Sequence, residues 1–328
     1  MANLRSPSMP HAAALDSVAH SYRRPPVVGM MLALSLCLNI LALILPFVVM
    51  DAAGSDPLIY GLLGSVQMLL DSHMVVLAGL VVVFSVIFPF AKLATLAWLW
   101  WRGVTTERRH SVLMWDEKLG KWSLFDVFFV AIMIGLTNDQ WLISSASLPG
   151  LTCFMGAVIL GMLAGERLTM LAGHPSAPVK TTAPRSGLSL SLLMVIGALL
   201  AAVFVLPFIQ IDDWRLSNRA YSLITLIPAL WQNHSPSLAI CMGTFVIAVP
   251  LVLWLFAVFT VLVWWNRQPP AVCMSLQEFL KRWSMLSVFA LSLGVFLAEG
   301  HRFLGTQPLS GVWALGICLS LIMIVQLF

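Results

Sequence analysis

Two ionisable residues, Lys92 and Asp126, lie inside long apolar runs of this sequence. A charge within an apolar membrane segment is costly and usually has a function. Lys92 follows Pro89 closely and precedes Arg102 by about ten residues, or about 15 Å of helix, which predicts a position near the middle of the membrane. Pro89 has no backbone N–H, so the carbonyl of Ser85 loses its helical partner and a kink is expected there.

Asp126 lies in the next apolar run, just after Ser123, and opposite charges on neighbouring helices can pair inside a bundle. One interpretation is a polar centre that lines a substrate path or a coupling site; its candidate members are Lys92, Asp126, Pro89, Ser85, Ser123, Thr137 and Asn138. Asp139 and Glu299 are weaker candidates, like Thr137 and Asn138, near the periplasmic boundary. The other interpretation is that Lys92 snorkels and Asp126 only satisfies a backbone group.

Motifs for other chemistry are absent from the sequence. It contains no GxSxG, no HExxH and no phosphate-binding GxxxxGK[ST] segment. None of the five cysteines forms a CxxC pair. We therefore expect no catalytic residues, no cofactor, no metal and no enzymatic activity. Nucleic acid is not an expected partner either, because the basic residues are spread over several loops.

The elements that position these residues follow from composition. Apolar residues make up 60% of the 328 residues and charged residues only 10%. Soluble domains average about 25% charged residues, so the chain is predicted to be an integral membrane protein. Apolar runs long enough to span a membrane predict an all-α protein with eight transmembrane helices, at about 27–49, 74–101, 121–142, 148–165, 188–209, 238–265, 283–300 and 310–328.

The distribution of basic residues between these runs predicts the orientation. Of the 18 Lys and Arg residues, fourteen fall on one side, three (Arg215, Arg219 and Arg302) on the other, and Lys92 within a run. Cytoplasmic loops carry the excess of Lys and Arg. Both termini are therefore expected in the cytoplasm, with the chain crossing the membrane several times.

An internal repeat runs through the sequence. An offset of 161 residues places the second half on the first, with matching Pro, Tyr, His, Glu and Trp residues. Pro89 falls on Pro250 and Trp122 on Trp283, whereas Lys92 falls on Leu253 and Asp126 on Ser287. Four spans per unit give two units of the same orientation. The charged centre exists only in the first unit.

The repeat defines the expected domains. They are a cytoplasmic tail (1–26), a first four-helix unit (27–165), a cytoplasmic linker rich in Pro, Thr, Ser and Ala (166–187), and a second four-helix unit (188–328). Between the first two spans of each unit, apolar residues recur at helical spacing. This pattern predicts a periplasmic amphipathic helix in each unit, as a lid on its own bundle or as a docking element for a partner.

Three segments resemble the paraquat-inducible protein A family. They are Pro-x-x-Lys at 89–92, Gly-Lys-Trp-Ser-x-x-Asp-Val-Phe at 120–128 and Leu-Pro-Phe at 45–47, and the likeness extends over about 27–328. The resemblance implies an inner-membrane protein that works with a periplasmic MCE-domain protein, which forms a tunnel for lipids between the two membranes. The membrane component would load or receive phospholipid. Unlike well-known members, this chain has no cysteine in 1–26 or 166–187, where zinc ribbons would lie.

Three functions are compared with the sequence. The first is phospholipid transport with an MCE-domain partner, in which Lys92 lies near the lipid headgroup or at a charge-coupled gate. The second is a membrane anchor that only seats a periplasmic complex, for which Lys92 and Asp126 are dispensable. The third, a quinone-linked thiol oxidoreductase, requires periplasmic cysteine pairs, which the sequence lacks.

The orientation is testable with reporter fusions. Fusions after Arg24, Thr106, Ala177 and Gln268 should report the cytoplasm, and fusions near Ser55, Ser147, Ser217 and Gln307 the periplasm, because Lys and Arg accumulate on the cytoplasmic side. Alkaline phosphatase and fluorescent-protein reporters distinguish the two sides. A periplasmic signal at Ala177 would rule out two units of the same orientation, since the first unit would then have an odd number of spans.

Overall fold

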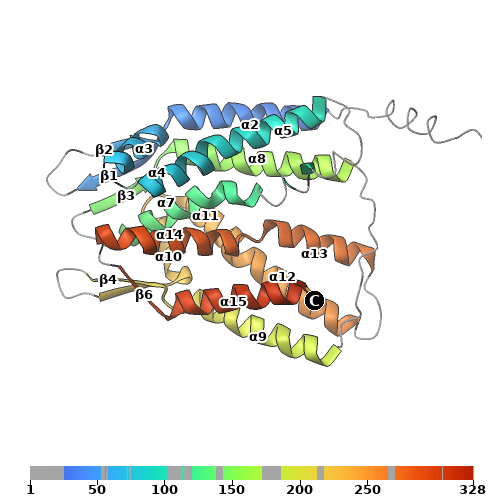
Figure 1. The fold of residues 1–328 in the computed structure, drawn as a ribbon. Coiled ribbons are helices and arrows are strands. Elements are labelled where there is room, and N and C mark those ends of the chain that lie inside the picture. Colours follow the sequence, from blue (N-terminus) through green and yellow to red (C-terminus); the bar gives the residue numbers. More distant parts are fainter. Residues whose placement is uncertain are drawn as a thin grey trace, which may run out of the picture.

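Long helices lie side by side in the computed structural model of the chain, and small sheets gather at one end of the bundle (Figure 1). The structure describes residues 26–52, 56, 58–71, 73, 75–101, 112–113, 115, 120–137, 143–171, 186–212, 218–264, 270–304 and 306–327.

The first unit begins with a long helix and ends with another, and its other elements lie between them. They follow in the order α2 (Pro26–Ile44), β1 (Pro46–Ala52), β2 (Leu58–Gly61), α3 (Leu62–Asp71), α4 (Val75–Val81), the π-helix η1 (Val82–Ile87), α5 (Phe88–Trp101), the 3₁₀-helix η2 (Lys121–Leu124), α7 (Phe125–Thr137), β3 (Ile143–Ser147) and α8 (Pro149–Leu171). Helix α8 continues to Leu171, so the segment from 166 is helical at its start.

The second unit has a similar order of elements. They are α9 (Ser186–Val205), β4 (Ile209–Asp212), β5 (Asn218–Tyr221), α10 (Leu223–Gln232), α11 (Pro236–Met242), the π-helix η3 (Gly243–Ala248), α12 (Val249–Val263), α13 (Ala271–Trp283), α14 (Leu286–Leu304), β6 (Thr306–Pro308) and α15 (Ser310–Leu327).

The offset of 161 residues relates the elements as well as the sequence. Adding 161 to the bounds of α3, 62 and 71, gives 223 and 232, the bounds of α10. The same shift carries η1 onto η3. Both units also turn at a histidine in the left-handed region, with a φ of 60° at His73 and 52° at His234.

Each π-helix is followed by a helix with a buried proline near its start. This proline is Pro89 in α5 and Pro250 in α12. A proline cannot donate a backbone hydrogen bond, so the carbonyls one turn earlier lose their usual partner. The turn widens in response: the N–H of Phe88 donates to the Val83 carbonyl, five residues back, and the N–H of Val249 donates to that of Thr244. The kink expected from the sequence is therefore a π-helical turn in both units.

Two antiparallel three-stranded sheets correct the expectation of an all-α protein. Their strand orders are β2-β1-β3 and β5-β4-β6, with the strand after the first helix of each unit in the centre. Pro46 disfavours a helical conformation at Leu45 and is followed by Phe47, Val48 and Val49, which favour an extended chain. Such a short strand beside a long apolar helix is hidden in a hydropathy pattern.

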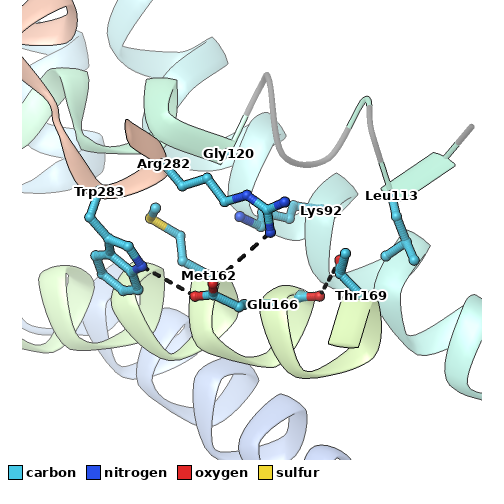
Figure 2. Close-up of a pocket in the computed structure, with 9 residues that line it drawn as sticks. Lys92, Leu113, Gly120, Met162, Glu166, Thr169, Arg282 and Trp283 are labelled. Carbon is cyan, nitrogen blue, oxygen red and sulfur yellow. Dashed lines mark hydrogen bonds and ion pairs between the residues drawn. The ribbon is translucent and has the colours of Figure 1, made fainter. Parts of the chain in front are cut away.

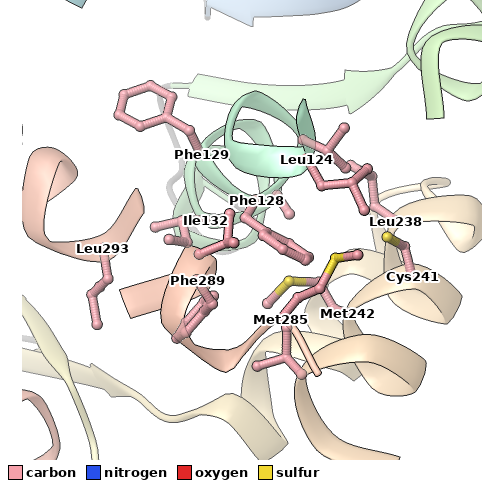
Figure 3. Close-up of a cluster of buried hydrophobic side chains, with 14 of the residues drawn as sticks. Leu124, Phe128, Phe129, Ile132, Leu238, Cys241, Met242, Met285, Phe289 and Leu293 are labelled. Carbon is pink, nitrogen blue, oxygen red and sulfur yellow. The ribbon is translucent and has the colours of Figure 1, made fainter. Parts of the chain in front are cut away.

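Helices α7 and α14 bring the two units together. Phe128 on α7 and Phe289 on α14, which the 161-residue offset relates, meet edge to face with ring centroids 6.4 Å apart. Figure 3 shows them within a cluster of buried side chains from both units. The Ser292 hydroxyl also donates to the Phe125 carbonyl across this interface (2.9 Å).

The two amphipathic helices expected from the sequence are present, but they pack differently. Helix α10 buries Leu223, Leu226, Ala229 and Leu230, and it packs against α7 of the first unit; α3 buries only Leu62. The difference follows from the side chains. Leu226 lies directly against Gly135 of α7, whereas the positions related by the offset are Ser65 and Phe296. A bulky phenylalanine leaves no such space for α3 on α14.

Five helical segments are long and apolar enough to cross a membrane: Pro26–Ile44, Leu77–Trp101, Pro149–Leu171, Pro236–Val263 and Val272–Ala298. Their outer surfaces are apolar, as lipid contact requires; Leu255, Phe259 and Leu262 of α12 are all exposed. The last segment includes α13 and starts before the expected span 283–300, with a break in the helix at Ser284. The three other expected spans, 121–142, 188–209 and 310–328, overlap α7, α9 and α15, which are not among these five segments.

The close contact at Gly135 predicts a destabilising substitution. Gly135→Leu should lower the free energy of unfolding by about 1–3 kcal/mol, because a side chain there overlaps Leu226. Thermal unfolding in detergent measures this change. Gly294→Ala on α14 is the matched control, since nothing lies within 4 Å of the added Cβ. Adding Leu226→Ala should restore part of the loss; equal stability of Gly135→Leu and the parent would contradict the packing described.

Candidate functional site

The π-helical turn before Pro89 positions a buried polar pair. Ser85 lies in η1, one turn before Pro89, and its hydroxyl donates to Oδ2 of Asp126 at 2.7 Å. Both residues are almost fully buried, with 2% and 3% of their surface exposed. Asp126 lies in the first turn of α7, where a negative charge is favoured by the helix dipole. The structure therefore brings together two of the residues expected from the sequence, at the point where both helices change geometry.

Ser123 belongs to the same polar region. It lies three residues before Asp126, in the 3₁₀ turn that leads into α7, so it is near Asp126 along one side of the chain. Its side chain is 1% exposed, and its hydroxyl has no hydrogen-bond partner among the described residues. Buried hydroxyls are nearly always hydrogen-bonded, and an exception deserves an explanation. A water molecule or a substrate group at Ser123 would supply one.

The second unit has no ionisable side chain at the positions that correspond to the Ser85–Asp126 pair. Ser85 and Asp126 correspond to Val246 and Ser287. Here the backbone N–H of Met285, just after the break between α13 and α14, donates to the carbonyl of Phe245 in η3 (3.2 Å). The ring of Phe245 also stacks on Trp283, with centroids 5.6 Å apart. The second unit joins its two broken helices through backbone and aromatic contacts, whereas the first uses a serine and a carboxylate.

Lys92 lies at a different level from Asp126. It follows Ser85 by seven residues, or about 10 Å along the helix. Its ammonium lies against Gly120, so close that a Cβ on Gly120 would be 2.5 Å from Nζ. Among the described residues no ion pair joins Lys92 to Asp126, whose hydrogen bond comes from Ser85. The pairing expected from opposite charges is therefore wrong, because two helical turns separate Lys92 from the level of Ser85.

The Lys92 side chain lines a small cavity of about 40 Å³. Its lining includes Lys92, Gly120, Glu166, Thr169, Arg282 and Trp283, as Figure 2 shows. Oε1 of Glu166 lies 4.0 Å from Nη1 of Arg282, and Oε2 accepts a hydrogen bond from Nε1 of Trp283 at 3.2 Å. From the sequence alone, Arg282 is expected only as one of the cytoplasmic basic residues, and Glu166 only as the first residue of the linker. The repeated Lys-Trp-Ser and Arg-Trp-Ser segments, at 121–123 and 282–284, were the signal that could have indicated this place.

The basic residue of each repeated segment reaches across the interface between the units. Lys121 of the first unit donates from Nζ to the Lys281 carbonyl at 2.7 Å, and Arg282 of the second unit faces Glu166 of the first. These segments therefore hold the units together beside the cavity. The remaining sequence candidates lie elsewhere: Thr137 ends α7 and Glu299 is in α14, but their side chains, and all of Asn138 and Asp139, fall outside the described residues.

The Ser85–Asp126 bond predicts a stability effect. Ser85→Val should lower the free energy of unfolding by about 1–3 kcal/mol, because Asp126 then remains buried without its hydrogen-bond donor. The double variant Ser85→Val with Asp126→Ser, which copies Val246 and Ser287, should recover most of that loss. Thermal unfolding in detergent compares the variants. A double variant less stable than Ser85→Val would show that the pair does not act as a unit.

The family profile of paraquat-inducible protein A matches residues 28–170 and 188–328. The intermembrane transport protein PqiA of Escherichia coli K12 is 30% identical over 137 residues, and that of Shigella flexneri matches equally. This alignment covers 40% of the chain and 33% of each relative, so the chain spans about a third of their length. No solved structure matches the chain. Because the two matched regions include almost all of the sequence, the chain belongs to the paraquat-inducible protein A family.

Proposed function

We propose that this chain is the inner-membrane component of a system that moves phospholipid between the inner and outer membranes, loading or receiving lipid for a periplasmic MCE-domain protein. The name of its relatives, intermembrane transport protein, supports such a role. In this proposal the chain crosses the membrane eight times, as two four-helix units of the same orientation with both termini in the cytoplasm. It transports without catalysing a reaction and needs no cofactor or metal.

The observation that carries the proposal is the buried Ser85–Asp126 pair beside the break at Pro89. Buried polar side chains are expensive in a membrane and mark transport paths more often than structural contacts. A purely structural role is already met in the second unit by the bond from Met285 to Phe245. The ionisable Ser85–Asp126 pair in the first unit is therefore better explained by a role in binding or moving the transported lipid.

The size of the cavity at Lys92 limits how lipid could bind. Pockets that enclose drug-sized ligands measure about 300–1,000 Å³, far above the 40 Å³ found here. Phospholipid acyl chains would therefore lie along the outer apolar surface of the helices, with only the headgroup near Lys92. This arrangement suits a protein that takes lipid laterally from the bilayer.

A second candidate function is an anchor that seats the periplasmic partner and moves no lipid. The observation that favours it is the second unit, whose helix α10 packs against α7 of the first unit. The second unit also has Leu253 and Ser287 in place of Lys92 and Asp126. An anchor needs stable packing and no polar centre. The two functions differ in whether the polar centre of the first unit is required.

The double variant Lys92→Leu with Asp126→Ser separates the two functions. It copies Leu253 and Ser287, which the second unit already carries at the corresponding positions, so it should insert normally. Under the transport proposal, cells that rely on this variant should lose envelope integrity, measured as detergent sensitivity, while immunoblots and co-purification show normal amounts of the chain and its partner. Leu253→Ala with Ser287→Ala is the matched control and should retain function. Full function of the copied centre would leave the anchor as the better account.

A further inference from the structure

The cavity at Lys92 is shared by the two units. Lys92, Gly120, Glu166 and Thr169 come from the first unit, and Arg282 and Trp283 come from α13 of the second. Figure 2 shows Arg282 and Trp283 extending from α13 toward Glu166 on α8. Among the described lining residues, two basic side chains from different halves of the protein thus share one small space with one carboxylate, that of Glu166.

The depth of the cavity matches the level of lipid headgroups. Glu166 lies five residues before the end of α8 at Leu171, or about 8 Å along the helix. The exposed side chains of Trp98 and Trp101 end the neighbouring helix α5, as tryptophans do at a membrane surface. The cavity is therefore near the boundary between headgroups and acyl chains, so the Lys92 side chain reaches this level and not the middle of the membrane expected from the sequence.

Glu166 is held as an internal anion in this place. Its side chain is only 10% exposed, and its two oxygens face Arg282 and Trp283. The 4.0 Å separation from Arg282 is at the outer limit of an ion pair, far from the short bidentate geometry that makes such pairs strong. An oxyanion with better geometry would compete for the same guanidinium.

We propose that this cavity binds the phosphate group of a phospholipid headgroup, with Lys92 and Arg282 as its cations and Glu166 as the resident anion that the phosphate displaces. This inference rests on the transport function proposed above and names the chemistry of its binding step. Arginine and lysine both bind phosphate, the first as a fork and the second as a point charge. By about 10–15 Å³ per water-sized group, 40 Å³ accommodates a few oxygens and excludes acyl chains.

Phosphate binding would also change the contact between the units. The bonds from Trp283 and Arg282 to Glu166 join α13 to α8. When phosphate takes the place of the carboxylate, these bonds are exchanged for bonds to the ligand. The bond from Lys121 to the Lys281 carbonyl lies outside the cavity lining and stays in place. Occupancy of the cavity is thereby linked to part of the interface.

The test measures binding to the full chain purified in a nonionic detergent. Isothermal titration with dihexanoyl-phosphatidylglycerol gives Kd for the parent, Glu166→Gln, Arg282→Gln and Lys281→Gln. Arg282→Gln should weaken binding about tenfold, since a charge-assisted hydrogen bond is lost. Glu166→Gln should tighten binding at least about threefold, because the competing anion is removed while an acceptor for Trp283 remains. Lys281→Gln removes an equal charge next to Arg282 but outside the cavity lining and should leave Kd within about twofold.

The gain of affinity in Glu166→Gln keeps the test decisive, because a misfolded protein does not bind more tightly. Weaker or unchanged binding by Glu166→Gln, or an unchanged Kd in Arg282→Gln, would overturn the inference. Inorganic phosphate that binds as tightly as the lipid would overturn the lipid assignment in favour of free phosphate, and equal binding of dihexanoylglycerol would exclude a phosphate site. These measurements need no partner protein, so loss of transport in cells leaves them unaffected, and lipid binding that ignores Arg282 refutes only this inference.

Discussion

The missing backbone N–H of Pro89 in α5 and of Pro250 in α12 is the constraint on which the rest of the structure depends. Within a membrane no water replaces a lost hydrogen bond, so a carbonyl freed by a proline needs a partner from the protein. In the second unit, Val249 bonds five residues back and Pro250 has no N–H, which frees the carbonyl of Phe245. Met285 supplies the replacement from the start of the next helix. The proline, the π-helical turn and the break between α13 and α14 are therefore parts of one arrangement in the second unit, and the repeat preserves the proline and the π-helical turn.

The first unit uses this arrangement for a polar centre. At the same level, Ser85 and Asp126 replace Val246 and Ser287, and Ser123 adds a buried hydroxyl. The units differ at the other end of α7 as well, where Gly135 admits Leu226 and packs α10 tightly against the first unit. A duplicated scaffold thus has one half that carries ionisable groups and one half that closes the interface around α7. This division of roles explains why the prolines and tryptophans recur while the charges do not.

The sequence predicted the features that depend on residue type at a fixed spacing. The offset of 161 residues, the distortion at Pro89 and the polar surroundings of Asp126 could all be inferred from it. The pairing of Lys92 with Asp126 could not, because the choice of partner depends on the level at which two helices meet, and Ser85 rather than Lys92 lies at that level. The short strands and the role of Glu166 were missed for a related reason. Each depends on contacts between distant segments, such as α8 with α13, that leave no local pattern.

The two polar places in the first unit share the helix that contains Pro89 and the segment 120–126, and residues of α8 and α13 complete the place at Lys92. Ser85 and Lys92 lie on either side of Pro89 in one helix, and Gly120 and Asp126 lie at the two ends of the turn that contains Ser123. The break at Pro89 therefore separates the two polar places along one helix, as the turn that contains Ser123 separates them along the other segment.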